Sequence, residues 1–495
     1  MNTPPKPESN LRFGALRHAL MGALSASILF VALRFLLTPV RIKVLTSLLS
    51  PTDYGMITLL SMSAHGMAVI LSFGGLEYML RMLPRADEAA RLRMLRRVLA
   101  VSGLPFCIVA VCILMGWAPA SWYGGQEGAA SPAAVALLFL LFMHVQQRIY
   151  FLLGCRQHVR ARVTQLLWSD LWFLPLLALL PWVEWRGDNV IWVWGIWLAV
   201  IVALTARWVP FWKRETASDT PVSMGDILRI GLPAMPAILG EWTFRLFGHY
   251  LLLAYTNFAT MALYALAVNV AMVGYVAGVP LVDKFSADLN SVDQSNAAGA
   301  AHAARIVSCC GRYLFAVAMP VALALLFSGD AVLHVLSGEA FWAAGAFLPW
   351  LAPMPFLLLM NLFLSRILVS VNRSNHVAVG SLVSAVAAVL LSLALIPNHG
   401  AFGAIWGMEA GIALAVIYFV IVSRVWRFLD AAVLGIGRLL LGAAMMVAVF
   451  WGLRLCELNA LVTLAIAGSA CLVIMLALRW VRLPDFIDHH EENAT

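Results

Sequence analysis

Long runs of apolar residues, separated by short polar segments, alternate along almost the whole chain. A membrane-spanning helix needs about 20 consecutive apolar residues. Runs of that kind predict helices near 18–40, 55–82, 98–117, 132–153, 161–182, 190–211, 227–253, 261–282, 307–328, 342–368, 376–397, 401–422, 433–453 and 459–480. The pattern indicates an all-α polytopic membrane protein with about fourteen transmembrane helices.

The composition makes the lipid bilayer the main solvent for this chain. Of its 495 residues, 62% are hydrophobic and 12% are charged, whereas soluble proteins carry roughly 25% charged residues. We expect the net charge of +8 to reflect basic residues in the cytoplasmic loops. Nucleic-acid binding is not expected, because no basic stripe is interleaved with aromatic residues. Without a GxxxxGK[ST] loop or an HExxH helix, we expect no ATP-driven pump, no metal site and no cofactor.

The basic residues between the apolar runs predict the orientation of the helices. If the N-terminus is cytoplasmic, the loops on that side hold most of the positive charge: Arg81, Arg85, Arg91, Arg93, Arg96, Arg97, Arg156, Arg160, Arg162, Lys213, Arg214, Lys284, Arg305, Arg366, Arg373, Arg424 and Arg427. The opposite loops carry Arg41, Lys43, Arg186 and Arg454. This asymmetry is the positive-inside pattern, and it predicts a multi-pass protein of the bacterial inner membrane with both termini in the cytoplasm.

A weak internal repeat predicts how the helices are grouped. Leu33-Arg34-Phe35-Leu36 in the first helix aligns with Phe244-Arg245-Leu246-Phe247 in the seventh. An offset of six helices keeps the two copies in the same orientation, so the repeat axis runs along the membrane normal. We therefore expect an N-terminal six-helix lobe over 1–212, a C-terminal six-helix lobe over 226–422, two additional helices over 430–482 and a disordered acidic tail over 483–495.

Three sequence motifs resemble a known superfamily. Leu48-Leu49-Ser50-Pro51-Thr52-Asp53-Tyr54-Gly55 leads into the second helix, where Phe73-Gly74-Gly75-Leu76 is followed by Arg81-Met82-Leu83-Pro84. Val371-Asn372-Arg373 is followed by Leu395-Ile396-Pro397 and by Gly400, Gly403 and Ala404. In this order the chain resembles the Wzx-type polysaccharide flippases of the multidrug/oligosaccharidyl-lipid/polysaccharide exporter superfamily, which are related to the lipid II flippase and to multidrug exporters.

The resemblance implies a function in polysaccharide export. It implies a flippase that moves a polyprenyl-pyrophosphate-linked oligosaccharide from the cytoplasmic to the periplasmic leaflet by alternating access. It also implies contact with membrane lipid and partners such as a polysaccharide polymerase and the export machinery. The chain carries Gly248-His249 where many members carry an Asp-Arg pair late in the seventh helix, so the role of that pair is not carried over.

Arginines within the apolar runs are the first candidates for substrate binding, because a charge in a membrane span needs a partner or a function. Arg34 lies deep in the first helix, and Arg41 follows on the same face with Thr38 between them. The two arginines are suited to bind a pyrophosphate through charge-assisted hydrogen bonds. They are also suited to pair with a carboxylate on a neighbouring helix.

A second row of polar residues lies on the seventh helix. Glu241, Arg245 and His249 follow each other at i, i+4 and i+8, and Glu241 can form an intrahelical salt bridge with Arg245. The repeat places Arg34 and Arg245 at similar depth, so we expect them to face each other across a central cavity.

Further charged residues are candidates for coupling and gating. Asp170 in the fifth helix and Glu409 in the twelfth are candidates for coupling to protons or sodium, and Asp170 is equally suited to pair with an arginine. Glu77 and Arg81, one turn apart, are candidates for a cytoplasmic gate or a structural pair. Arg148 is a candidate for the same gate, or it is a basic residue near the membrane edge that only sets the topology.

Two rival classes of function differ from the flippase in what they require. A multidrug or metabolite exporter of the same fold would favour an acidic cavity, which disagrees with Arg34, Arg41 and Arg245. A membrane polysaccharide polymerase or ligase usually needs a large outer loop, and the outer loops here are short. We therefore expect a transporter and not an enzyme.

The predicted topology can be tested by cysteine labelling in a variant that lacks the native cysteines. Cysteines placed at Gly124 and Asn398 should react with a membrane-impermeant maleimide added from the periplasmic side, whereas cysteines at Ala89 and Ala298 should not. Labelling of all four positions from the same side would contradict the topology.

Overall fold

The computed structural model describes residues 30, 33, 34, 36–117, 131–183, 185–209, 223–292, 297–371, 373–429, 434–456, 458–478 and 480. Within these residues the structure is almost entirely helical and contains no β-strand. The prediction of an all-α polytopic membrane protein is confirmed. The start of the expected first helix and the expected acidic tail lie outside the described residues.

The N-terminal half of the chain, up to residue 209, begins with a helix that is described at residues 33, 34 and 36–48 and that we call the first helix. It continues with α2 (Pro51–Ile70), α3 (Gly75–Met82), η1 (Leu83–Arg85), α4 (Glu88–Leu114), α5 (Pro132–Gly154), α6 (His158–Ser169), α7 (Leu174–Leu179) and α8 (Gly187–Thr205).

The C-terminal half, residues 223–429, and the final helix pair complete the chain. They comprise α9 (Met224–Gly231), η3 (Leu232–Ala234), α10 (Met235–Trp242), η4 (Thr243–Phe247), α11 (Gly248–Tyr255), α12 (Phe258–Ser291), α13 (Ala297–Leu336), η5 (Glu339–Phe347), α14 (Met354–Ser370), α15 (Ser374–His399), α16 (Ala401–Ser423), η6 (Val425–Phe428), α18 (Ile436–Leu455) and α19 (Ala460–Ala477).

The described helices follow the apolar segments seen in the sequence. In the described part of the chain, 9 helices are long and apolar enough to cross a membrane, and α2 with α3, bent by 60°, counts as a tenth if the pair is one span. The remaining expected spans correspond to the first helix, to α6 with α7, to α9–α11 and to α14. Each of these is short or interrupted in the described residues, so none of them is a single helix long enough to cross a membrane.

The bend between α2 and α3 follows from local sequence. Gly74 has a φ of +75°, a conformation that favours glycine. A methyl group added at Gly74 would collide with the backbone of Gly231 at the end of α9. The second span therefore breaks where it meets the seventh, and the close approach of two glycines joins the two halves of the chain there.

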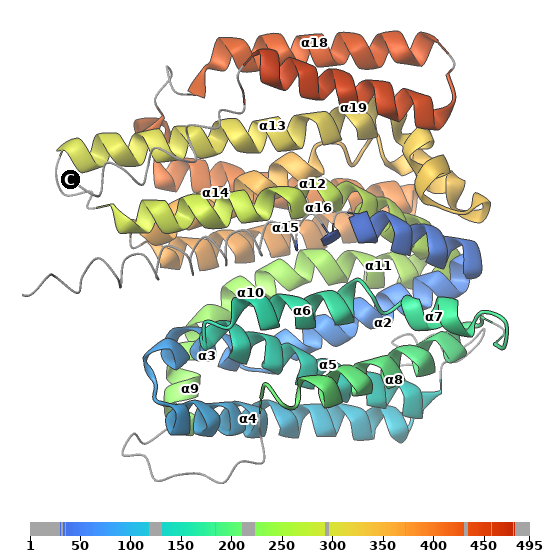
Figure 1. Cartoon of the computed structure of the whole chain (residues 1–495), viewed down its shortest axis with the longest axis vertical. Helices are drawn as coiled ribbons and strands as arrows, with labels where there is room; N and C mark the ends of the chain where they lie inside the picture. Colours follow the sequence, from blue (N-terminus) through green and yellow to red (C-terminus); the bar gives the residue numbers. More distant parts are fainter. Residues whose placement is uncertain are drawn as a thin grey trace, which may run out of the picture.

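The helices lie side by side in Figure 1, with α4, α5, α6 and α8 towards one side, α12 to α16 in the middle, and α18 and α19 covering α13 on the other side. α2 packs against α12 and α3 packs against α9, so the second span contacts the C-terminal half along its length. The division into two six-helix lobes and an additional pair remains a prediction.

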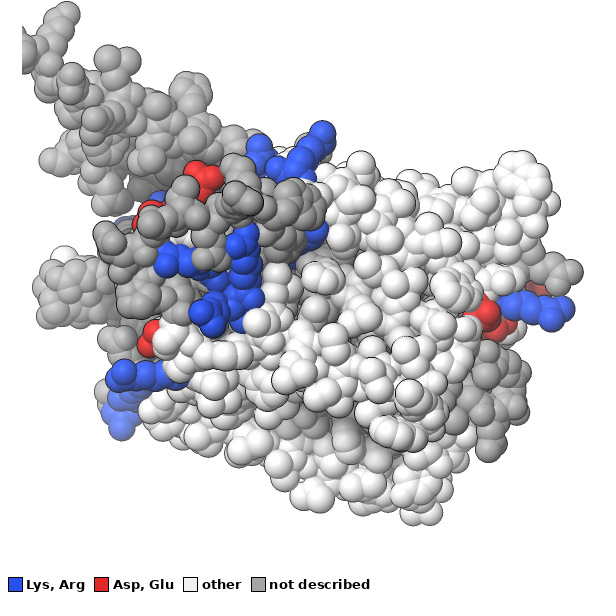
Figure 2. Space-filling model, turned by 90° about the horizontal axis from the view of Figure 1, so that it is seen from below, with Lys and Arg blue, Asp and Glu red and all other residues white. Residues whose placement is uncertain are grey.

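The two ends of the helix bundle differ in charge. α4, α6 and α15 begin, and α5, α14 and α16 end, at one end of the molecule. Figure 2 shows that most of the visible lysines and arginines gather at one end of the molecule. We call this the basic end, and the other end the opposite end. Among the arginines at or near the basic end are Arg81, Arg91, Arg93, Arg97, Arg156, Arg160, Arg366 and Arg373.

A row of glycines on α16 allows unusually close contact with α15. A methyl group at Gly411 would lie 2.7 Å from the carbonyl oxygen of Ser384, and one at Gly407 would lie 2.8 Å from the backbone nitrogen of Ser392. Gly403 approaches the backbone of Leu395 in the same way. Small residues spaced by four let membrane helices approach closely without a hydrophobic driving force, and this spacing fixes the α15–α16 pair.

Replacing Gly407 with leucine should separate these helices. The larger side chain would meet the α15 backbone, and overpacking of this kind costs about 1–3 kcal/mol. We expect a lower midpoint of thermal unfolding for Gly407→Leu in detergent. Gly468→Leu on α19 is the matched control, because a methyl group there would meet nothing within 4 Å. Equal midpoints for the two variants would contradict the close contact.

Candidate functional site

The structure brings three sequence candidates together at one carboxylate. Arg34 Nε lies 2.9 Å from Asp170 Oδ2, and Arg41 Nη1 lies 3.8 Å from Asp170 Oδ1. Thr38, between the two arginines on the first helix, donates a hydrogen bond to Asp170 Oδ1 at 3.5 Å. The side chain of Asp170 is 1% exposed. Asp170 is therefore the partner of two arginines, as one reading of the sequence allowed.

The end of α6 holds this carboxylate in place. Asp170 is the C-cap residue of α6, and the hydroxyl of Ser169 donates a hydrogen bond to Asp170 Oδ2. Arg41 Nη1 donates a hydrogen bond to the backbone carbonyl of Ser169. A cation at a helix C-terminus is favoured by the helix dipole, so Arg41 satisfies both a carbonyl and a charge.

The cluster of Arg34, Thr38, Arg41, Ser169 and Asp170, which we call the Arg–Asp cluster, carries an excess of positive charge. Two guanidinium groups share one carboxylate, and the arginine side chains remain 30% and 24% exposed. Each guanidinium has five N–H donors, of which only some are used here. The arrangement can therefore accept a further anion without first losing its internal partner.

The other face of the first helix contacts the C-terminal half. Lys43 Nζ donates a hydrogen bond to the carbonyl of Ser337 at 2.5 Å, and the backbone nitrogen of Gly338 donates to Thr46 Oγ1 at 3.0 Å. Residues two apart on a helix point to nearly opposite sides, so Arg41 faces α6 while Lys43 faces the end of α13. The first helix thus contacts α6 of the N-terminal half and the end of α13 in the C-terminal half.

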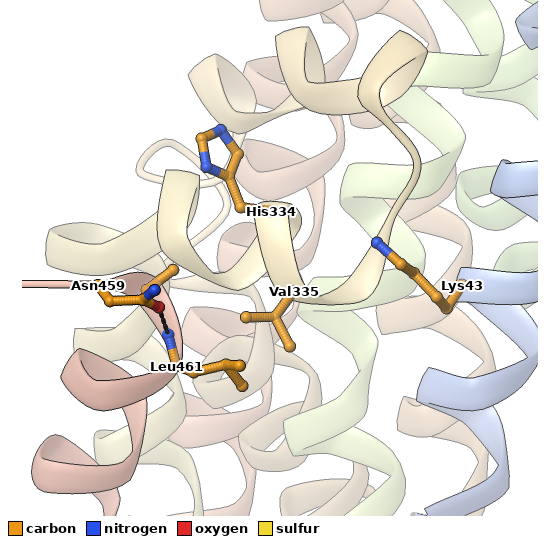
Figure 3. A pocket seen from close by; sticks show the side chains of 6 residues that line it. Lys43, His334, Val335, Asn459 and Leu461 are labelled. Carbon is orange, nitrogen blue, oxygen red and sulfur yellow. Dashed lines mark hydrogen bonds between the residues drawn. The ribbon is translucent and has the colours of Figure 1, made fainter.

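A surface pocket of about 480 Å³ lies beside this contact. Lys43, His334 and Val335 line it together with Asn459, Ala460 and Leu461 at the start of α19 (Figure 3). Asn459 caps α19 by accepting a hydrogen bond from the backbone nitrogen of Leu461 at 3.0 Å. The pocket therefore lies where the final helix pair meets the first helix and α13.

The candidates on the seventh helix are only partly described. The side chains of Glu241 and Arg245 lie outside the described residues, so their salt bridge and the facing of Arg34 and Arg245 remain predictions. The backbone of Arg245 lies in η4, a π-helical turn, and such turns occur frequently at functional sites. His249 is buried and its ring contacts the edge of Tyr264, with ring centroids 4.9 Å apart.

The remaining candidates lie apart from the Arg–Asp cluster. Glu409 on α16 is half-buried, and its Oε1 makes no hydrogen bond to any residue that the structure describes. Glu77 is half-buried and Arg81 is exposed, and the two form no ion pair with one another among the described side chains. Arg148 is 3% exposed and donates to the carbonyl of Val202 at 2.6 Å and to Thr205 Oγ1 at 2.8 Å.

One arginine on α6 was not singled out as a site residue in the sequence. Arg162 donates a hydrogen bond to Gln165 Oε1 at 2.9 Å. In the sequence it reads as a topology charge, because it begins an apolar run. The signal that could have identified it is the i, i+3, i+7 spacing of Arg162, Gln165 and Ser169, which places all three on one face of α6.

The geometry of the cluster predicts unequal effects of removing its members. Asp170→Ala leaves two arginines without their shared carboxylate, and breaking a buried ion pair in this way costs on the order of 3 kcal/mol. Arg34→Ala leaves Asp170 with Arg41, Thr38 and Ser169, so its cost should be smaller. Thermal unfolding in detergent should rank Asp170→Ala as clearly less stable than Arg34→Ala. The reverse order would show that Asp170 is not shared between Arg34 and Arg41.

Comparison with known proteins concerns the fold alone. No protein-family profile matches the chain, and no curated protein matches it in sequence. Among solved structures, one described as the lipid II flippase MurJ in an inward closed conformation superposes with a TM-score of 0.69 at 10% identity, covering 92% of this chain and 98% of that chain.

Transporters of a second kind share the same arrangement of helices. An inward-facing multidrug resistance MATE family transporter of the MOP superfamily superposes with a TM-score of 0.61 at 16% identity, covering 81% of this chain and 94% of that chain. An outward-facing structure of a transporter of that family gives a TM-score of 0.52 at 16% identity, with 83% and 94% covered. The chain is thus a multi-pass membrane protein with the fold shared by MurJ and the MATE transporters of the MOP superfamily.

Proposed function

We propose that this protein is a flippase that moves a polyprenyl-pyrophosphate-linked oligosaccharide across the bacterial inner membrane, for export of a polysaccharide. The observation that carries the proposal is the Arg–Asp cluster. Two partly exposed guanidinium groups of the first helix lie next to one buried carboxylate at the end of α6. A pyrophosphate is the part of such a substrate that needs positive charge within a membrane.

The proposed direction of transport follows from the charge of the two ends. The basic end would lie in the cytoplasm according to the positive-inside pattern. The contacts of Lys43 with Ser337 and of Thr46 with Gly338 would hold the opposite end closed. In alternating access, the substrate would bind from the cytoplasm in this state, and these contacts would break when the opposite end opens.

A multidrug or metabolite exporter of the same fold is the second candidate. The likeness to MATE transporters supports it as much as it supports a flippase, because the fold is shared. The charge of the site favours the flippase. Many exported drugs are cations, and they would be repelled by a site in which two arginines share one carboxylate.

The proposal is tested by a flipping assay in proteoliposomes with a polyprenyl pyrophosphate that carries one fluorescent sugar. Arg34→Ala and Arg41→Ala should each slow flipping by about tenfold or more, because each removes a charge-assisted contact to phosphate. Arg34→Lys should retain part of the rate, since it keeps the charge but loses the bidentate fork.

Arg305→Ala serves as the matched control, because Arg305 is an exposed arginine near the start of α13. It should flip at the rate of the unchanged protein. In cells, removal of the protein should leave the completed lipid-linked oligosaccharide on the cytoplasmic leaflet. Full flipping by the Arg34→Ala/Arg41→Ala variant, or appearance of the glycan on the periplasmic side without the protein, would refute the proposal.

A further inference from the structure

The pocket at the opposite end is built from three parts of the chain, and we call it the opposite-end pocket. Its volume is about 480 Å³, and its lining comprises Lys43 of the first helix, His334 and Val335 near the end of α13, and Asn459, Ala460 and Leu461 at the start of α19. Figure 3 shows Lys43 on one side and Asn459 and Leu461 on the other. A ligand in this pocket would touch the N-terminal half, the C-terminal half and the final helix pair at once.

The polar groups that line the opposite-end pocket are mainly hydrogen-bond donors. Lys43 Nζ has three N–H bonds, of which one donates to the carbonyl of Ser337 at 2.5 Å. Asn459 Oδ1 accepts from the backbone nitrogen of Leu461 at 3.0 Å, so the amide nitrogen of Asn459 keeps two further donors. Among the residues that the structure describes, neither an aspartate nor a glutamate lines the pocket. Donors next to a positive charge suit an anion.

The start of α19 adds to the attraction for an anion. α19 extends over 18 residues, and its first two residues line the pocket. The first turn of a helix carries the positive end of the helix dipole and backbone N–H groups that point out of the helix. The charge of Lys43 and the start of α19 therefore act on the same space from two sides.

Exposed apolar side chains next to the pocket indicate that the anion belongs to a lipid. Leu36, Val40 and Lys43 follow each other at i, i+4 and i+7, so they share one face of the first helix. Leu36 is 66% exposed and Val40 is 49% exposed, and Leu461 in the pocket lining is 63% exposed. Large apolar side chains exposed on a membrane-spanning helix contact acyl chains. A phospholipid with its phosphate beside Lys43 would have its chains along this face.

We propose that the opposite-end pocket binds the phosphate of an anionic phospholipid from the leaflet at that end of the molecule. Lys43 supplies the charge, and the amide of Asn459 with the first turn of α19 supplies hydrogen bonds. The bound headgroup ties the first helix to α19, beside the contact of Lys43 with Ser337. The proposal goes beyond the flippase function and does not require it, because binding is measured without transport.

The test titrates the purified full-length protein in detergent with phosphatidylglycerol. Bound lipid is counted by native mass spectrometry, and the midpoint of thermal unfolding is measured in parallel, because a ligand of the folded state raises it. Lys43→Gln should weaken phosphatidylglycerol binding by about tenfold, the effect of losing one charge-assisted contact. Arg454→Gln is the matched control, since it removes one positive charge from an exposed residue in the last turn of α18, outside the pocket lining. It should bind phosphatidylglycerol like the unchanged protein.

Asn459→Asp separates lipid binding from folding. Aspartate caps a helix as well as asparagine does, but it replaces the two amide donors with a negative charge. Without lipid, the unfolding midpoint of Asn459→Asp should equal that of the unchanged protein. Phosphatidylglycerol should raise the midpoint of this variant much less, because the carboxylate repels the phosphate.

Phosphatidylcholine and glycerol 3-phosphate identify the source of the anion. Phosphatidylcholine with the same acyl chains has no net charge, so it should stabilise the unchanged protein and Lys43→Gln equally. Glycerol 3-phosphate has the anion without the chains, so it should stabilise the unchanged protein less than phosphatidylglycerol does.

Three results would overturn the proposal. In the first, Arg454→Gln weakens phosphatidylglycerol binding as much as Lys43→Gln does, which would indicate a general effect of surface charge. In the second, Asn459→Asp binds phosphatidylglycerol like the unchanged protein. In the third, glycerol 3-phosphate produces the whole effect of the lipid, which would make the pocket a site for soluble anions.

Discussion

The structure depends on how charge is satisfied inside a membrane. Within lipid, backbone groups and ionised side chains must find partners in the protein. Asp170 meets this requirement for Arg34 and Arg41 at once, and it does so at the end of α6, where a helix leaves carbonyl groups unpaired. This one carboxylate thereby fixes the position of the first helix against the N-terminal half and leaves spare positive charge beside it.

The first helix derives its role from having two different faces. One face carries the arginines towards α6, and the other carries Lys43 and Thr46 towards the end of α13. A movement of the two halves must therefore either break the contacts with Ser337 and Gly338 or carry the Arg–Asp cluster along. In the proposed cycle, binding of an anion at the cluster and opening of the opposite end would be coupled through this helix.

Another arginine within the apolar runs is held by contacts of a different kind. Arg148 was a candidate for the gate, and its guanidinium contacts Val202 and Thr205 at the end of α8. Such contacts satisfy a carbonyl group at a helix end, and the role of Arg148 in a gate stays a prediction. The Arg–Asp cluster differs because its arginines retain exposed surface, which is what binding a ligand requires.

Several features could be read from the sequence because they depend on residues close together in the chain. The apolar runs gave the positions of the helices, and Ser50-Pro51 with Asp53 preceded the second helix. The bend at Gly74, inside the span expected over 55–82, was not predicted. The sequence also indicated that Arg34, Thr38 and Arg41 share a face and that Asp170 was suited to pair with an arginine. It could not show that these residues meet, because 136 residues separate Arg34 from Asp170.

Only the tertiary structure decided which helix faces contact each other. Helices in lipid are apolar on all sides, so hydrophobic periodicity does not reveal which face is buried in the protein. For that reason the sequence left Arg366 as a topology charge, and the fold placed it beside Asp283 on another helix. Local sequence determined where each helix begins, bends and ends, and long-range contacts between small and charged residues determined the partners.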